Sequence, residues 1–298
     1  MTTAVTTSLT STVRTGSVVV GIDGSVSSDA ALEWAAHYAG ERRRPLVVVH
    51  GAGDVRTHTE FVDAETESRV LLAGALRVTD HARGVLEQEA PGLDMQVLSP
   101  LEDPRDTLVE LSERASMVVV GTRGLGPVKA LLLGSVSTAL VSHATCPVAV
   151  VRPPAGSPDV ITGSVVVGTD GGQASVAALE LAFELASTAD VDLVVVHSYV
   201  SSDRLVDWAS YELRVQEIDE HDRILSESLA GYAEKYPDVT VVRHLASAGP
   251  VQALVDLSAG ASAVVVGSRG RTGWAGTFAS VSRDVVELAH CTVVVVRA

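Results

Sequence analysis

The sequence repeats itself at the length of a whole domain. Residues 17–50 align without a gap with 164–197, and 19 of the 34 positions are identical. Two later segments repeat in the same order, 115–124 as 261–270 and 134–152 as 279–297. A repeat unit of this length exceeds the ~20–50 residues of a solenoid repeat, so each copy can bury its own core. Two copies of one fold can pack about a pseudo-twofold axis, and we therefore expect a pseudo-dimer within the chain.

The repeats divide the chain into two domains. We expect a flexible Thr/Ser-rich leader (1–16), a first domain (17–152), a linker with three prolines (153–163) and a second domain (164–298). The leader lacks the apolar stretch of a signal peptide, which predicts a cytoplasmic protein.

Composition excludes several classes of function. The chain carries 22 basic and 37 acidic residues, a net charge of −15, which argues against binding to nucleic acid or to anionic lipid. Its apolar runs are shorter than the ~18–20 residues of a membrane span. Cys146 and Cys291 fall at equivalent places in the two copies, where we expect two small core residues rather than a disulfide framework.

Short Val-rich runs alternate with helical spacing in each copy. In copy one we expect strands near 17–21, 46–50, 94–99, 117–121 and 147–152, and helices near 27–40, 62–90 and 103–114 and from Ser135. In copy two we expect strands near 164–168, 193–197, 239–246, 263–267 and 292–297, and later helices near 205–236 and 249–260 and from Ser280. Ser27 or Ser28 is the expected cap of the first helix. This alternation predicts α/β domains with a doubly wound parallel sheet, and we expect the two last strands to lie side by side.

Glycines follow the strands at the edge of the sheet where such folds bind ligands. The first strand ends in Gly21-Ile22-Asp23, the second in His50-Gly51, and the fourth runs into a glycine-rich loop that leads to Ser135. Glycines let backbone N–H groups converge, and a helix N-terminus adds further N–H donors. Ser135 and Ser137 add hydroxyl groups. Together these features suit a polyphosphate.

The glycine-rich loop resembles that of the universal stress protein family, whose ATP-binding members carry G-x2-G-x9-G-[ST]. Copy one matches this pattern with Gly121, Gly124, nine residues, Gly134 and Ser135. The GIDGS and GTDGG turns and the CPVAVVR ending are also similar to that family. The resemblance covers the whole chain after the leader and implies two tandem Rossmann-like domains that bind an adenine nucleotide.

The resemblance also implies roles for particular residues. Those expected to hold ATP, with Mg²⁺, in copy one are Gly21, Ile22, Asp23 and Gly51 at the adenosine end, Val120 and Gly121 along the ribose, and Arg123, Gly124, Gly134, Ser135 and Val136 at the phosphates. Their counterparts in copy two are Gly168, Asp170, Gly267, Arg269, Gly270, Ser280 and Val281.

Each of these residues also has a simpler structural interpretation. Asp23 suits a turn, His50 and His197 suit hydrogen-bonded structural histidines, and Arg123 suits a solvated loop. Copy two has lost one loop residue and carries Ala279 in place of Gly134, so occupancy of its site is doubtful.

Three functions remain open at this point. The leading hypothesis is a nucleotide-dependent regulator that meets a protein partner, as a single chain or as a homodimer of chains. The alternatives are a slow ATPase and a scaffold that works without nucleotide. Neither loop is a Walker A sequence, so we expect no catalytic residues, and no cysteine or histidine cluster predicts a metal site of its own. The GIDGS turn lacks the G-x-G-x-x-G of dinucleotide-binding dehydrogenases.

Overall fold

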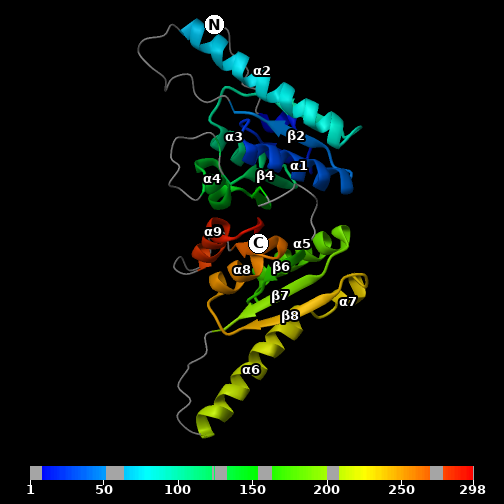
Figure 1. Cartoon of the computed structure of the whole chain (residues 1–298), viewed down its shortest axis with the longest axis vertical. Helices are drawn as coiled ribbons and strands as arrows, with labels where there is room; N and C mark the ends of the chain where they lie inside the picture. Colours follow the sequence, from blue (N-terminus) through cyan, green and yellow to red (C-terminus); the bar gives the residue numbers. More distant parts are fainter. Residues whose placement is uncertain are drawn as a thin grey trace. The chain divides into compact units, whose positions relative to one another are not determined.

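The computed structural model describes residues 9–51, 64–122, 124, 133–153, 163–199, 208–268 and 278–297. The chain forms two compact units, unit 1 (residues 1–153) and unit 2 (residues 154–298) (Figure 1). The division falls inside the expected linker. The packing of the units as a pseudo-dimer, with their last strands side by side, stays a prediction.

Unit 1 is built from alternating strands and helices. Its elements are η1 (Leu9–Thr12), β1 (Val18–Gly21), α1 (Val26–Glu41), β2 (Leu46–Val49), α2 (Ala64–Glu89), β3 (Met95–Leu98), α3 (Pro104–Leu111), β4 (Met117–Gly121), α4 (Ser135–His143) and β5 (Val148–Val151). The strands are parallel in the order β3-β2-β1-β4-β5. The order reverses between β1 and β4, which is where doubly wound sheets bind ligands.

Unit 2 repeats this plan with longer strands. Its elements are β6 (Ser164–Gly168), α5 (Gln173–Ala189), β7 (Leu193–Ser198), α6 (Trp208–Ser228), α7 (Tyr232–Lys235), β8 (Val241–Ala246), α8 (Pro250–Ser258), β9 (Ala261–Ser268), α9 (Phe278–Leu288) and β10 (Thr292–Arg297). The strands are parallel in the order β8-β7-β6-β9-β10, and the reversal lies between β6 and β9.

The central strands form the core of each unit. Val18, Val19 and Val20 of β1 are fully buried, as are Val166 and Val167 of β6. Helices lie against the sheet on both sides: in unit 1, α1 packs on β1, β4 and α2, while α3 packs on β1 and α4. The doubly wound α/β fold expected from the repeated Val runs is therefore confirmed, because strands covered on both faces have no need of polar alternation.

The start of α1 corrects one prediction. Its N-cap is Ser25, whose hydroxyl accepts a hydrogen bond from the backbone N–H of Ser28, so neither Ser27 nor Ser28 caps the helix. Both of those serines are buried inside the first turn. Several hydroxyl groups of the Ser-rich run could serve as the helix cap. Which of them does so depends on where the helix starts, and this is set by the sharp turn at Gly24, which has a φ of +81°.

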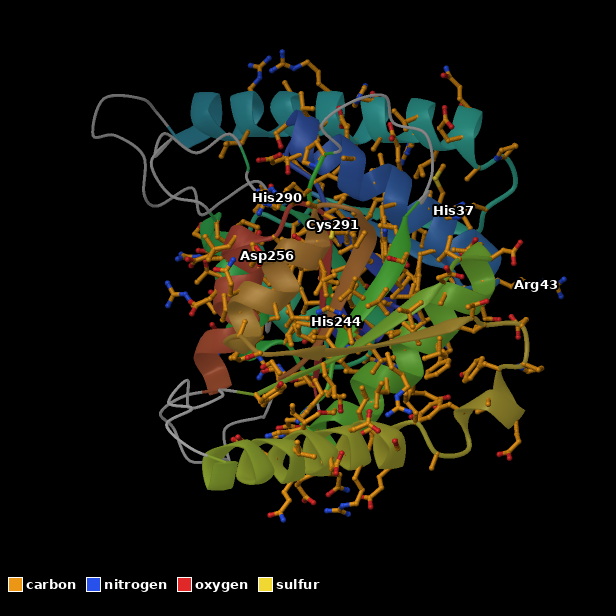
Figure 2. The ribbon with its side chains drawn as sticks, turned by 60° about the horizontal axis from the view of Figure 1, so that its bottom comes forward. His37, Arg43, His244, Asp256, His290 and Cys291 are labelled. Atoms are coloured by element: carbon orange, nitrogen blue, oxygen red, sulfur yellow. The ribbon has the colours of Figure 1, made fainter. Side chains whose placement is uncertain are left out.

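Polar side chains line the exposed edge strand of unit 2. β8 pairs with β7 and ends the order of that sheet. Its residues Arg243 and His244 are exposed, and Figure 2 labels His244. Arg243 Nη2 lies 2.6 Å from Oδ1 of Asp222 on α6. Charge on an edge strand hinders pairing with another chain.

Both cysteines are free thiols. Cys146, just before β5, is buried, and this burial raises its pKa to about 12. Cys291, just before β10, is partly exposed (Figure 2). A thiol that stays protonated is a poor nucleophile, so Cys146 is a small core residue.

Candidate functional site

The turn after β1 is held in place by a histidine and by its own carboxylate. Nδ1 of His50, which follows β2, donates a hydrogen bond to the carbonyl oxygen of Ile22 over 2.9 Å. Asp23 Oδ1 accepts a hydrogen bond from the backbone N–H of Ser25 at 3.0 Å. The structural role expected for His50 is confirmed, and the turn-forming role of Asp23 is present as well. Oδ2 of Asp23 lies toward Gly124 of the glycine-rich loop.

Two glycines of that loop lie where no side chain fits. A Cβ atom placed on Gly124 would overlap Oδ2 of Asp23, and one on Gly121 would lie 2.5 Å from the carbonyl oxygen of Ser27. Next to this contact the hydroxyls of Ser27 and Thr122 are 3.3 Å apart. The structure therefore brings Asp23, Gly121 and Gly124 together at the point where the strand order reverses. Backbone approaches as close as these are the usual reason for glycine in a loop that receives a ligand.

The N-terminus of α4 completes this edge of unit 1. Gly134 is the N-cap and offers no side-chain acceptor, so the first N–H groups of the helix have no capping group. The N–H of Gly134 itself donates to the carbonyl oxygen of Thr122 at 2.9 Å. That N–H group is therefore already bonded within the protein, and the expected place of Gly134 at the phosphates stays a prediction. Ser137, also expected to offer its hydroxyl, donates it to the carbonyl oxygen of Gly121 at 2.8 Å. Ser135 and Val136 remain as first-turn residues at the site.

Three other expected residues have packing roles. A Cβ on Gly51 would lie 2.8 Å from Cα of Pro104, and one on Gly21 would lie 2.7 Å from a methyl group of Leu108. Val120 is buried in β4. These residues allow α3 to approach the strand ends, so they shape the edge of the site. Arg123 lies outside the described residues.

Unit 2 has a cavity at the corresponding edge. It measures about 260 Å³ and lies at the ends of β6, β7 and β9, next to α5, α8 and α9. Four of the expected residues, Gly168, Asp170, Gly267 and Val281, line it. A Cβ on Gly267 would lie 2.6 Å from the carbonyl oxygen of Ala174, as the counterpart Gly121 lies against Ser27. Arg269 and Gly270 lie outside the described residues, and only the backbone of Ser280 is described.

The carboxylate of Asp170 is held differently from that of Asp23. Asp170 Oδ1 accepts hydrogen bonds from the N–H of Gly172 at 2.9 Å and from the hydroxyl of Ser175 at 2.6 Å. His197 repeats the role of His50, because its Nδ1 donates to the carbonyl oxygen of Thr169 at 2.9 Å. The aspartate of each unit thus orders the turn between the first strand and the first helix.

Sequence reasoning missed several residues that line the cavity of unit 2. Thr169 stands where unit 1 has Ile22, and Ser198 stands where unit 1 has Gly51. Both add hydroxyl groups, and Leu254 of α8 adds an apolar wall. The alignment of the two copies contains the signal that finds the first two, since each is a polar substitution at a predicted contact position.

Glycine cradles at the carboxyl ends of strands fit the backbone of a phosphate-containing ligand. The N-terminus of α4, whose N-cap Gly134 has no side chain, adds N–H donors and a partial positive charge. Within the described ranges, no group of three His, Cys, Asp or Glu side chains is placed to hold a metal ion. A divalent cation would therefore be bound mainly by the phosphates it accompanies. None of the described helices is long and apolar enough to cross a membrane.

The fold and these strand ends define a tandem α/β protein of the doubly wound class. A model described as the universal stress protein family matches residues 15–152 and again 162–297. The chain belongs to the universal stress protein family.

The chain is similar to curated relatives over nearly its whole length, and one solved structure shares its fold over that length. Universal stress protein Rv2005c of Mycobacterium tuberculosis is 41% identical over 294 residues, which cover 94% of this chain and 96% of that protein. The crystal structure of a universal stress protein from Archaeoglobus fulgidus covers 95% of this chain and 97% of its own, with a TM-score of 0.67 and 21% identity, and so shows the shared fold. A shorter universal stress protein from Archaeoglobus fulgidus, solved in complex with dAMP, covers 46% of this chain and 99% of its own at 26% identity and a TM-score of 0.35.

Proposed function

We propose that this chain binds ATP, together with Mg²⁺, at the carboxyl ends of its strands. The observation that carries this proposal is the contact of Gly124 with Asp23 and of Gly121 with Ser27 at the reversal of the strand order. Together with the hydrogen bond from the N–H of Gly134 to Thr122, these contacts bring the turn after β1, the end of β4 and the N-terminus of α4 to one edge of the sheet. Such an edge suits a nucleotide whose sugar lies near the turn and whose phosphates reach the helix.

The bound nucleotide would act as a regulator of the chain's contacts with other proteins in the cytoplasm. A ligand that binds one form of a protein raises the population of that form, and partners can then read the change. Two alternatives come from other classes of function: slow ATP hydrolysis, and a scaffold role that needs no nucleotide. Neither glycine-rich loop has the G-x4-G-K-[ST] pattern of P-loop ATPases, which favours binding over hydrolysis.

Thermal unfolding with and without ATP–Mg²⁺ tests the binding step. In chain stripped of nucleotide, a ligand at 100 times its Kd raises the free energy of unfolding by about 2.7 kcal/mol. Gly124→Ala should reduce the rise in melting temperature, because the new methyl group would displace the Asp23 carboxylate. Gly74→Ala is the matched control, since a Cβ there meets nothing within 4 Å, and it should keep the full rise. No rise in the unaltered chain at millimolar ATP–Mg²⁺ would count against binding and would favour the scaffold.

Phosphate release separates a regulator from an ATPase. In a single-turnover experiment with excess protein, we expect hydrolysis of ATP to be much slower than its dissociation, so that ATP binds and leaves many times without being cleaved. Release of inorganic phosphate on the timescale of ATP dissociation would favour the ATPase. Mass spectrometry of the protein as purified would show directly whether an adenine nucleotide accompanies it.

A further inference from the structure

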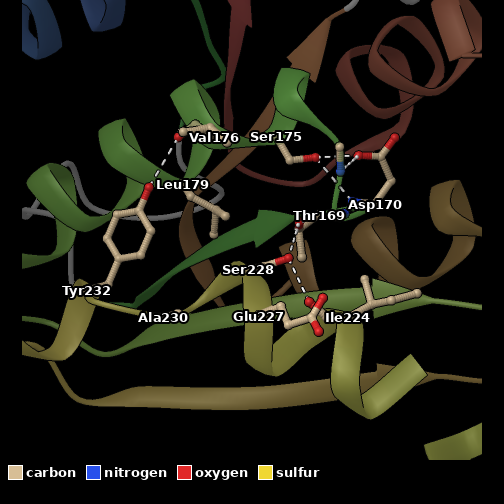
Figure 3. Close-up of a pocket in the computed structure, with 12 residues that line it drawn as sticks. Thr169, Asp170, Ser175, Val176, Leu179, Ile224, Glu227, Ser228, Ala230 and Tyr232 are labelled. Carbon is tan, nitrogen blue, oxygen red and sulfur yellow. Dashed lines mark hydrogen bonds between the residues drawn. The ribbon is translucent and has the colours of Figure 1, made fainter. Parts of the chain in front are cut away.

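A second cavity lies in unit 2, between α5 and α6. It measures about 410 Å³, within the range of ~300–1,000 Å³ typical of small-molecule sites. Figure 3 shows its lining, with Val176 and Leu179 from α5 on one side and Ile224 and Glu227 from α6 on the other. It shares Thr169, Asp170 and Ser175 with the strand-end cavity but lies on the other side of that turn, away from Gly267 and α8.

The walls of this cavity offer an apolar surface to a ligand. Val176 is 54% exposed, unusually high for a large aliphatic side chain, and Leu179 is buried behind it. The ring of Tyr232 stacks on Phe183 with centroids 4.5 Å apart, and its hydroxyl donates to the carbonyl oxygen of Val176 at 3.5 Å (Figure 3). A flat ring held in this way is a rigid surface for another ring or for an alkyl group.

The charged groups of the lining are acidic. Among the described residues that form it, Asp170 and Glu227 are charged, and both are carboxylates. Asp170 Oδ1 already accepts two hydrogen bonds from its own turn. Glu227 Oε1 lies 2.5 Å from Arg223, in an ion pair whose side chains are more than half exposed. Exposed pairs of this kind contribute little, so a cation in the cavity can compete for Glu227.

Unit 1 has a direct contact between charged groups at the equivalent position. A Cβ on Gly24 would touch Val78, and one on Gly171 would touch Ile224, so α2 and α6 occupy equivalent places beside the first helix. In that register Val176 corresponds to Asp29 and Glu227 to His81. Nε2 of His81 lies 3.3 Å from Oδ2 of Asp29, which joins α1 to α2. Unit 2 has lost this pair and has an apolar residue and a carboxylate in its place.

We propose that the cavity between α5 and α6 binds a small amphipathic cation, namely a primary amine that carries an aromatic or branched aliphatic group. The apolar group packs against Tyr232, Leu179 and Ile224. The ammonium group lies at Glu227, where it replaces or shares the exposed contact with Arg223. The site shares the turn around Asp170 with the strand-end cavity but has its own walls in α5 and α6, so it can be tested on chain stripped of nucleotide, whether or not ATP binds.

Matched probes of opposite charge test this proposal on the full chain. In ligand-observed NMR titrations we expect 2-phenylethylammonium to bind at least tenfold more tightly than 3-phenylpropanoate, which has a similar size and the opposite charge. Glu227→Gln should weaken amine binding at least fivefold. Glu220→Gln is the control, because Glu220 contacts the same Arg223 at 2.6 Å but does not line the cavity, and it should leave amine binding unchanged.

A double variant tests the location of the site. Val176→Asp with Glu227→His rebuilds the pair found in unit 1, and it should abolish amine binding while the melting temperature stays within a few degrees of the original. Val176→Trp, at an exposed position, should block the cavity and give the same loss. Equal affinity for the two probes, or unchanged amine binding in Glu227→Gln or Val176→Trp, would overturn the proposal.

Discussion

The two units share their strands and differ in what joins their first two helices. In unit 1 the pair Asp29–His81 connects α1 and α2, and in unit 2 the equivalent residues are Val176 and Glu227 beside an open cavity. Four of the five strands repeat nearly residue for residue, whereas β3 and β8 and the segments that contain α2 and α6 do not. The comparison teaches that the repeated Val runs fix the sheet, while the helices beside it are free to diverge and to acquire separate sites.

The ends of the strands, by contrast, are built alike in the two units. Gly121 lies against Ser27, and Gly267 lies against Ala174, so both units need a glycine where the fourth strand ends. Their first turns are also held alike, by His50 and by His197. The backbone of this edge is therefore built in the same way twice, and differences in binding between the units can arise from the substitutions Thr169 and Ser198 and from the loops that follow.

The largest expected effect tests this shared construction. Gly121→Val and Gly267→Val should each destabilise the chain by about 3 kcal/mol or more, because the new side chain would meet backbone atoms of α1 or α5. Gly74→Ala, in an open helical position, should be neutral or should stabilise by up to ~1 kcal/mol. Urea unfolding measures all three. A small effect for one valine variant and a large effect for the other would show that the strand ends are not equivalent.

A smaller difference is expected between the two histidines. His197→Ala should destabilise by about 2 kcal/mol and His50→Ala by about 1 kcal/mol. Both variants lose the hydrogen bond to the first turn, but Nε2 of His197 also lies 3.0 Å from Nδ1 of His221, and His197 is buried. His221→Ala should lower the free energy of unfolding by the difference between the two histidine variants, because it removes the contact with His197 and leaves the hydrogen bond to the turn. Equal losses for the two histidine variants would contradict this account.

The smallest effect concerns two equivalent glutamates. Burial, together with Glu89 and Asp29, raises the pKa of Glu33 above its ordinary value of 4.5, whereas Lys235 and Tyr236 hold the pKa of Glu180 below it. A raised pKa means that the native state loses stability as pH rises through the pKa, and a lowered pKa means that it loses stability as pH falls. At pH 7 Glu33→Gln should therefore stabilise slightly, and Glu180→Gln should destabilise by about 0.5 kcal/mol, the scale of an exposed ion pair.

The free energy of unfolding, measured from pH 3 to pH 7, checks the sign of the effect of each glutamate variant. Both differences should shrink toward pH 3, where the carboxyl groups of native and unfolded chains are protonated to similar extents. Effects of the same sign for the two variants at pH 7 would show that the two positions have equivalent surroundings after all.

The sequence predicted the strands well because their Val runs need no partner to be recognised. It failed where the outcome depends on contacts between distant residues. The N–H of Gly134 is bonded to Thr122, and the choice of Ser25 as a cap depends on the turn at Gly24. The break between α6 and α7, expected as one helix, occurs at Gly231, whose φ is +82°. The cavity between α5 and α6 was not predicted, because it arises from residues about 50 positions apart that carry no motif.

Several of the residues predicted for the site lie together in the structure, although their binding of a nucleotide stays a prediction. Asp23, Gly121 and Gly124 meet as expected, because strand ends in a parallel sheet converge on one edge. Gly21 and Gly51 lie at the same edge, where their lack of a side chain makes space for Leu108 and Pro104 of α3. A sequence motif does not reveal this packing role.

Titration calorimetry of the full chain, stripped of nucleotide, with ATP–Mg²⁺ tests the central claim most directly. The copies differ in their loops, since copy two is one residue shorter there and carries Ala279 in place of Gly134. We therefore predict one tight event per chain, with the second site weaker by at least ~1.4 kcal/mol, a tenfold ratio in Kd. Gly134→Ala should abolish the tight event, and Gly270→Ala should preserve it. Two equal sites per chain would contradict the predicted difference between the copies, and no heat of binding at all would contradict the proposed function.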